Sequence, residues 1–228
     1  MARQVKPEEY AARRAQILAT ALELIREKGY QEMTISDVLT TLSISKGAFY
    51  HYFDSKRALL DGIVEMFATD FSAAAQHVVS DPALDAMAKL RTYLLSALDW
   101  KAERSSELAA IGHMWRHEDN AVLKQRISQA SQRIQGPLLA AIIRQGCAEA
   151  VFNVTHPDEA ALIIAGMGLQ LGDALIDAFT EPADRTSLAD HRAVLVEAHL
   201  EALERILGAT PRALTVLTPQ IAGTSFPS

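Results

Sequence analysis

Residues 34–56, TISDVLTTLSISKGAFYHYFDSK, decide the fold, because they encode two short helices joined by a tight turn. Thr34 is followed three residues later by Asp37, which is the spacing of a capping box at the start of a helix. Ser43, Ile44 and Ser45 then interrupt the first helix. Ser45 is placed to cap a second helix that begins at Lys46. The stretch therefore predicts a helix-turn-helix.

The second predicted helix divides its residues between two faces. Phe49 and Phe53 are four residues apart, so both can anchor the helix to a core. Lys46, Gly47 and Tyr50 then point elsewhere. One buried face and one small, polar face is the arrangement with which a helix enters a DNA major groove. The alternative is a plain packing element, but three consecutive ring-bearing residues, 50–52, are a costly surface for a helix without a partner.

This stretch resembles the helix-turn-helix of TetR/AcrR-type transcriptional regulators. The residues that carry the resemblance, in order and spacing, are Thr34, Ser45, Gly47, Phe49, Tyr50, Phe53, Ser55, Lys56, Leu59 and Leu60. The resemblance extends back through a first helix, at about residues 8–28. The chain departs from the family at Leu39, where alanine is usual, and at Ser43, where the turn usually has glycine. If that turn position has a positive φ, serine costs about 1 kcal/mol without forbidding the turn.

The resemblance implies an all-α protein of about nine helices. Residues 1–55 would form a three-helix DNA-binding domain, with the motif at about 34–53. Residues 56–208 would form a larger effector-binding and dimerisation domain, followed by a tail at 209–228. The sequence itself predicts that the first helix ends at Gly29 and that Gly136-Pro137 kinks or divides a long helix. It also predicts a helix at about 106–115, a break at 151–156, and a poorly regular tail.

The resemblance also implies which residues touch operator DNA. Ser45, Lys46 and Gly47 correspond to the family's base-reading positions. Lysine there would suit the acceptors of guanine, and glycine permits close approach. The remaining candidates correspond to phosphate contacts, and the full set is Thr34, Ser45, Lys46, Gly47, Tyr50, His51 and Lys56.

Composition supports a folded chain with a DNA-binding end. The 228 residues are 49% hydrophobic and carry a net charge of −6. Residues 1–60 hold nine Lys/Arg and seven Asp/Glu, giving +2, so the acidic excess lies in the remainder. No apolar run is long enough to span a membrane, and the start has no signal-peptide pattern. The single cysteine, Cys147, fits a reducing cytoplasm.

The family implies a homodimer, formed by the last two long helices. We assign residues 158–180 and 187–207 to that interface, where small residues allow close helix approach. The alternative is that these glycines serve packing within one chain. The interface candidates are Ile163, Gly166, Leu169, Gly172, Asp173, Ile176, Val194, Ala198 and Leu203.

A small apolar or amphipathic effector is the second expected partner, beside double-stranded DNA. Its cavity would be lined by the fifth to eighth predicted helices. The candidates are Tyr93, Leu94, His113, Met114, Trp115, Ile143, Phe152 and Leu169.

Other chemistry has little support in the sequence. His113 and His117 are four residues apart and could share a metal, but they also suit an ordinary surface or pocket. Cys147 has no second cysteine to resolve an oxidised thiol. We expect no metal, no cofactor and no enzymatic activity. The sequence thus predicts a dimeric, effector-released transcriptional repressor; an effector-independent activator or architectural DNA binder, or a helical enzyme with an incidental helix-turn-helix, are the alternatives.

Overall fold

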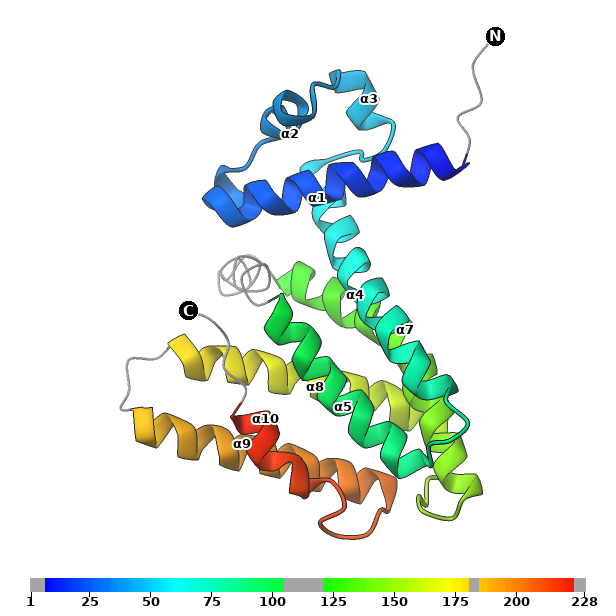
Figure 1. Cartoon of the computed structure of the whole chain (residues 1–228). Coiled ribbons are helices and arrows are strands. Elements are labelled where there is room, and N and C mark those ends of the chain that lie inside the picture. The colour runs from blue at the N-terminus through cyan, green and yellow to red at the C-terminus, as the bar shows by residue number, and fades with distance from the viewer. Residues whose placement is uncertain (1–6, 105–120, 181–184, 224–228) are drawn as a thin grey trace. The chain divides into compact units, whose positions relative to one another are not determined.

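In the computed structural model the described residues are 7–104, 121–180 and 185–223, and every regular element within them is helical (Figure 1). This confirms the all-α prediction. The predicted helix at 106–115 lies outside the described residues. The elements are α1 (Pro7–Glu32), α2 (Ile35–Leu42), α3 (Lys46–Tyr50), α4 (Lys56–Ser80), α5 (Ala86–Glu103), α7 (Ala121–Ala148), α8 (Pro157–Thr180), α9 (Arg185–Leu207), the 3-10 helix η2 (Thr215–Leu217) and α10 (Thr218–Ala222).

The chain divides into two compact units, and one boundary falls within α4, between Phe67 and Ala68. We call the described residues 7–67 the head and the described residues 68–104 and 125–223 the body. The sequence analysis placed the boundary at residues 55 and 56. The head also takes in the first turns of α4, because Leu59, Leu60 and Ile63 are buried.

The head is built on one long helix and three shorter segments that cover it. Helical geometry in α1 breaks at Gly29, where φ is 80° and ψ is 157°, as the sequence predicts. The buried face of α1 meets buried residues of the later head helices. The core residues are Ile17, Leu18, Ala21, Ile25, Met33, Val38, Phe49, Phe53, Leu59, Leu60, Ile63 and Phe67.

The turn between α2 and α3 contains a left-handed residue. Ser43 has φ 50° and ψ 44°, so the position does need the conformation that glycine adopts freely. The amide of Ile44 donates to the carbonyl of Leu39 at 3.0 Å, which closes the end of α2. Serine at this position therefore adopts a strained backbone conformation within the turn.

The body is a helical bundle in which α8 and α9 lie side by side (Figure 1). Its core draws on α4, α5, α7, α8, α9 and the C-terminal helices. The predicted break at 151–156 is present, and Val151 and Phe152 both donate their amides to the carbonyl of Gly146. The Phe152 ring fills the space above Gly146, where an added Cβ would lie 1.9 Å from Cδ2.

Proline inside α7 does not divide that helix. α7 is assigned as a single helix from Ala121 to Ala148 with Pro137 inside it. The neighbouring Gly136 is buried, and a Cβ there would lie 2.9 Å from Leu162 Cδ2. The pair Gly136-Pro137 therefore marks a close approach between α7 and α8.

The prediction of a poorly regular C-terminal tail is wrong for residues 215–222, which form η2 and α10, whereas residues 209–214 contain turns. The segment 209–223 buries Leu214, Leu217 and Ile221 in the body core. The carboxylate of Glu204, only 6% exposed, accepts the amides of residues 212, 214 and 215 at 3.1, 2.6 and 3.0 Å. Arg91 donates two guanidinium N–H groups to the carbonyl of Ala213, at 3.0 and 2.8 Å. Two charged side chains thus fix the segment to the bundle.

Candidate nucleic-acid interface

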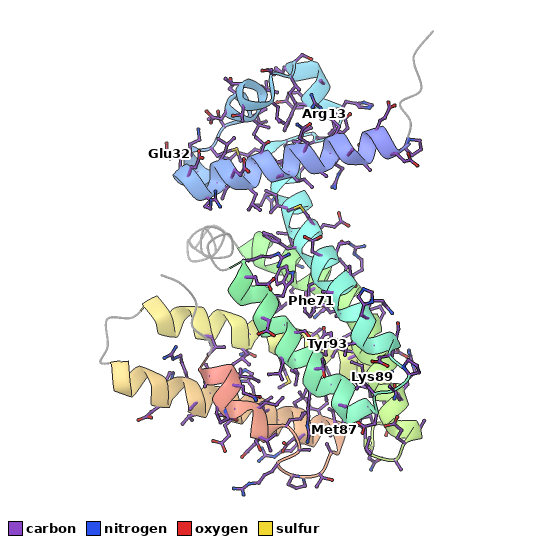
Figure 2. All side chains as sticks on the ribbon, viewed as in Figure 1. Arg13, Glu32, Phe71, Met87, Lys89 and Tyr93 are labelled. Carbon is purple, nitrogen blue, oxygen red and sulfur yellow. The ribbon has the colours of Figure 1, made fainter. Side chains whose placement is uncertain are left out.

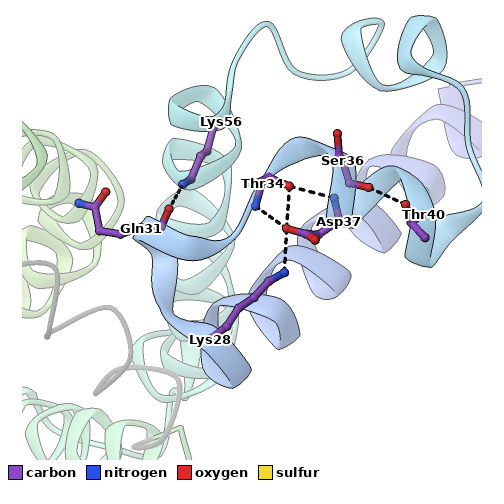
Figure 3. A network of polar contacts seen from close by, with 7 residues as sticks. All are labelled: Lys28, Gln31, Thr34, Ser36, Asp37, Thr40 and Lys56. Atoms are coloured by element: carbon purple, nitrogen blue, oxygen red, sulfur yellow. Dashed lines mark hydrogen bonds and ion pairs between the residues drawn. The ribbon is translucent and has the colours of Figure 1, made fainter.

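The first motif helix begins at a complete capping box (Figure 3). Asp37 donates its amide to Thr34 Oγ1 at 3.2 Å, and Thr34 donates its amide to Asp37 Oδ2 at 2.7 Å. Lys28 Nζ lies 2.7 Å from the same carboxylate. Hydrogen bonds from Lys28 and then Thr34 hold the pKa of the Asp37 carboxyl well below its usual range. This confirms the predicted cap and ties the end of α1 to the start of α2.

The second motif helix is short, capped and anchored on one side. The amide of Ala48 donates to Ser45 Oγ at 3.1 Å, which confirms Ser45 as the cap of α3. Phe49 is fully buried and Phe53 is 3% exposed. These two rings lie 6.0 Å apart and seat the helix on the head core.

The other face of α3 is open to solvent. Its exposed residues are Lys46, Gly47, Tyr50 and His51. The side chain of Tyr50 is 41% exposed although it is large and aromatic. Lys46 Nζ lies 5.9 Å from the centre of the Tyr50 ring. A Cβ on Gly47 would meet only Ser45 Oγ, at 4.0 Å, so packing does not require glycine there. Because glycine has no side chain to project from this face, another surface can approach the backbone closely here.

His51 belongs to a cluster of three rings that sequence reasoning missed. Tyr10, in the first turn of α1, lies 5.6 Å from the His51 ring at 83° and 4.7 Å from the Tyr52 ring at 33°. His51 and Tyr52 are themselves 5.2 Å apart at 80°. Nothing in the spacing of Tyr10 points to this contact, because it joins segments far apart in the chain.

Lys56 is directed partly inward. Its ammonium donates to the carbonyl of Gln31 at 3.0 Å (Figure 3). The same ammonium lies 4.3 Å from the centre of the Tyr30 ring. Burial lowers the pKa of this ammonium, and the nearby carboxylates of Glu32 and Asp37 oppose that shift. One of its three donors is therefore used within the head, and its contact with phosphate stays a prediction.

The effector candidates differ in how deeply they are buried. Tyr93 is 3% exposed and donates its hydroxyl to Gln135 Oε1 at 3.1 Å. Burial raises the pKa of that hydroxyl. The centre of the Tyr93 ring lies 5.4 Å from that of Phe71 (Figure 2). The Phe71 ring centre lies 5.9 Å from that of Trp100. Leu94 and Leu169 are half-buried, whereas Ile143 and Phe152 are core residues. His113, Met114 and Trp115 lie outside the described residues.

The dimer candidates differ in exposure. Ile163 on α8 is 57% exposed and Val194 on α9 is 65% exposed, and Ala198 is also exposed. Leu162, which the sequence analysis did not select, is 43% exposed. Leu203 is 5% exposed and packs in the body core, so it does not share this exposed face. Gly166, Leu169 and Gly172 are half-buried, and the side chains of Asp173 and Ile176 lie outside the described set.

The head matches a known sequence family. Residues 17–63, from the middle of α1 into α4, match the model described as "Bacterial regulatory proteins, tetR family". The match spans the capping box, the left-handed turn and the open face of α3. The head of this chain therefore carries the sequence pattern of tetR-family regulatory proteins.

Curated relatives are similar over only part of their own length. The HTH-type transcriptional repressor KstR2 of Rhodococcus jostii (strain RHA1) is 29% identical over 89 residues, which are 39% of this chain and 43% of that protein. The chain spans only 32% to 43% of the length of KstR2 and three other curated relatives that it matches.

Solved structures are similar over nearly the whole chain. A TetR-family transcriptional regulator from Pectobacterium atrosepticum has a TM-score of 0.64 at 23% identity, covering 87% of this chain and 97% of that one. RolR in complex with resorcinol has a TM-score of 0.61 at 18% identity, covering 98% and 99%. These likenesses show that the body shares the family's fold.

Other sites that the sequence suggested can be placed only in part. Within residues 7–104, 121–180 and 185–223, no three His, Cys, Asp or Glu side chains are grouped to hold a metal ion. His113 and His117 lie outside those ranges. Cys147 is half-buried, with its Sγ 3.7 Å from the carbonyl of Val154. In the same ranges, no helix is both long and apolar enough to cross a membrane.

Proposed function

We propose that this chain is a dimeric, sequence-specific DNA-binding transcriptional regulator, and that it acts as a repressor. The observation that carries the proposal is the open face of α3. A capped helix seated by Phe49 presents lysine, glycine, tyrosine and histidine to solvent. Such a face serves a major groove, in which lysine reads guanine and the flanking groups reach phosphates. The repressor assignment takes support from the similarity to KstR2, an HTH-type transcriptional repressor.

DNA binding is tested with fragments that the purified protein selects from its own genome. The wild-type affinity for the selected duplex should fall linearly with salt on a log–log plot. Lys46→Ala should mainly reduce the difference in affinity between the selected duplex and a scrambled one. Tyr50→Ala should weaken both duplexes about equally. Arg205→Ala, which removes an exposed cation from α9, is the matched control and should change neither affinity. Binding that is insensitive to salt and sequence would remove this function.

Dimerisation is proposed through α8 and α9. The exposed aliphatic side chains of Ile163 and Val194 support it, because they place apolar surface on two helices that lie side by side. Ile163→Glu should convert the dimer to a monomer in light scattering and abolish tight operator binding. Val216→Glu is the matched control, because Val216 is 58% exposed but lies on η2. A wild-type monomer at micromolar concentration would contradict this part of the proposal.

A small apolar or amphipathic effector is proposed to bind the body and release the operator. The buried rings of Phe71 and Tyr93 support it, as does the Ser131 hydroxyl, which has no hydrogen-bond partner among the described residues. The structural likeness to RolR, which has been solved in complex with resorcinol, points to the same class of ligand. A fluorescence screen of phenols and fatty acids, followed by operator-release assays, tests this. If saturating ligands leave the operator bound, the effector-independent alternative holds.

A further inference from the structure

The orientation of α3 depends on few contacts, because the helix is only five residues long. A single helical turn of this length does not persist in water without tertiary support. Ser45 fixes its first turn, and the buried Phe49 fixes its middle. The residues that follow it, His51 and Tyr52, need their own support. That support comes from α1.

Tyr10 supplies this support from the first turn of α1. Its ring lies 4.7 Å from Tyr52 in a tilted stack and 5.6 Å from His51 in an edge-to-face contact. With the 5.2 Å contact between His51 and Tyr52, each ring in the cluster touches the other two. Tyr10 and Tyr52 are half-buried, whereas His51 is exposed. The cluster therefore restrains the imidazole from one side and leaves its remaining surface free.

We infer that Tyr10 is a positioning residue for DNA binding: its ring sets the orientation in which His51 meets a backbone phosphate. The inference rests on the proposed function, since it takes His51 as a DNA contact. Edge-to-face and offset aromatic pairs have preferred geometries, so the phenyl ring of Tyr10 restricts the imidazole more than an aliphatic side chain does. Pre-arrangement of a contact raises affinity by lowering the ordering cost of binding.

A double-mutant cycle on operator affinity tests the inference. The proteins are wild type, Tyr10→Leu, Tyr10→Phe, His51→Ala and the Tyr10→Leu/His51→Ala double variant. Tyr10→Leu keeps apolar volume but removes the ring, and it should weaken operator binding roughly threefold per head and roughly tenfold for a dimer with two heads. Tyr10→Phe keeps the ring and should stay within about twofold of wild type. In the His51→Ala background, Tyr10→Leu should add less than about twofold.

Three results would overturn the inference. Tyr10→Leu weakening binding by the same factor with and without His51 would mean that Tyr10 acts independently of the imidazole. Tyr10→Phe losing as much as Tyr10→Leu would mean that the phenol hydroxyl itself contacts DNA. His51→Ala binding at the wild-type level would mean that there is no contact to position. In each case the selected duplex would still be bound in a salt-dependent way. Absence of salt-dependent, sequence-preferring binding by wild type would instead show that the proposed function had failed.

A measurement without DNA separates positioning from loss of fold. The His51 Hε1 resonance in the free protein feels the ring currents of its two tyrosine neighbours. Tyr10→Leu should shift this resonance, while Tyr10→Phe should leave it near its wild-type position. Circular dichroism should show the same helix content in both variants. An unmoved resonance in a folded Tyr10→Leu variant would contradict the ring contact itself.

Discussion

Ser43→Gly should stabilise the head by relieving the left-handed turn between α2 and α3. At φ 50° and ψ 44°, a residue with a Cβ pays roughly 1–2 kcal/mol relative to the right-handed region. Glycine loses about 0.5–1 kcal/mol more backbone entropy on folding. The Ser43 side chain is exposed, and no hydrogen bond of its hydroxyl is found within the described ranges. The net expectation is a gain of about 0.5–1 kcal/mol, or a factor of about two to five in the opening equilibrium.

Hydrogen exchange measures this gain in the head alone. The amide of Ile44, bonded to the carbonyl of Leu39 at 3.0 Å, should become about two to five times better protected in Ser43→Gly. The amide of Asn153, bonded to Leu207 in the body, is the internal control and should not change. Ala48→Gly, inside α3, is the control of opposite sign and should destabilise the head by about 1 kcal/mol. Unchanged or weaker protection of Ile44 in Ser43→Gly would refute the strain argument.

Three further changes test the caps and the packing. The pKa of Asp37 is lowered in the folded state, so its carboxylate stabilises the head fully above the usual aspartate pKa of about 4. This stabilisation is lost as the pH falls from there towards the pKa of the folded state. In Asp37→Asn, the unfolding free energy of the head should therefore depend less on pH in this acidic range. Gly146→Ala should cost about 1–3 kcal/mol in thermal unfolding, because its Cβ would overlap Phe152, whereas Gly168→Ala, with nothing within 4 Å, should be neutral or stabilising. Glu204→Ala should cost about 2–4 kcal/mol, because it leaves backbone donors without an acceptor; proteolysis should then cut within 209–223 first, and equal resistance to wild type would contradict this role.

The features that the sequence predicted correctly depend on neighbours within one turn. Thr34 with Asp37, and Ser45 with Ala48, are contacts three residues apart, so the order of the chain already contains them. The same is true of Gly29, whose conformation is a local property of the backbone. This is why the helix-turn-helix could be predicted in detail before any packing was known.

The features that it missed depend on partners distant in sequence. The pattern of prolines and threonines after Gly208 hid a segment that is held by Glu204 and Arg91. Leu203 was placed on an exposed face because α9 reads as apolar on more than one side, and only packing decides which side faces the core. Tyr10 was passed over for the same reason, since its ring partners are on α3 and just beyond it.

The hydrogen bonds from the amides of residues 212, 214 and 215 to Glu204 have a practical consequence for truncation of this protein. A chain that stops at Gly208 would keep all the long helices. Its truncation would nevertheless expose the apolar surface that Leu214, Leu217 and Ile221 cover in the full-length protein. It would also leave the Glu204 carboxylate without the three backbone amides that now solvate it. Such a truncation should precipitate on expression, so trimming for crystallisation should spare everything through Gly223.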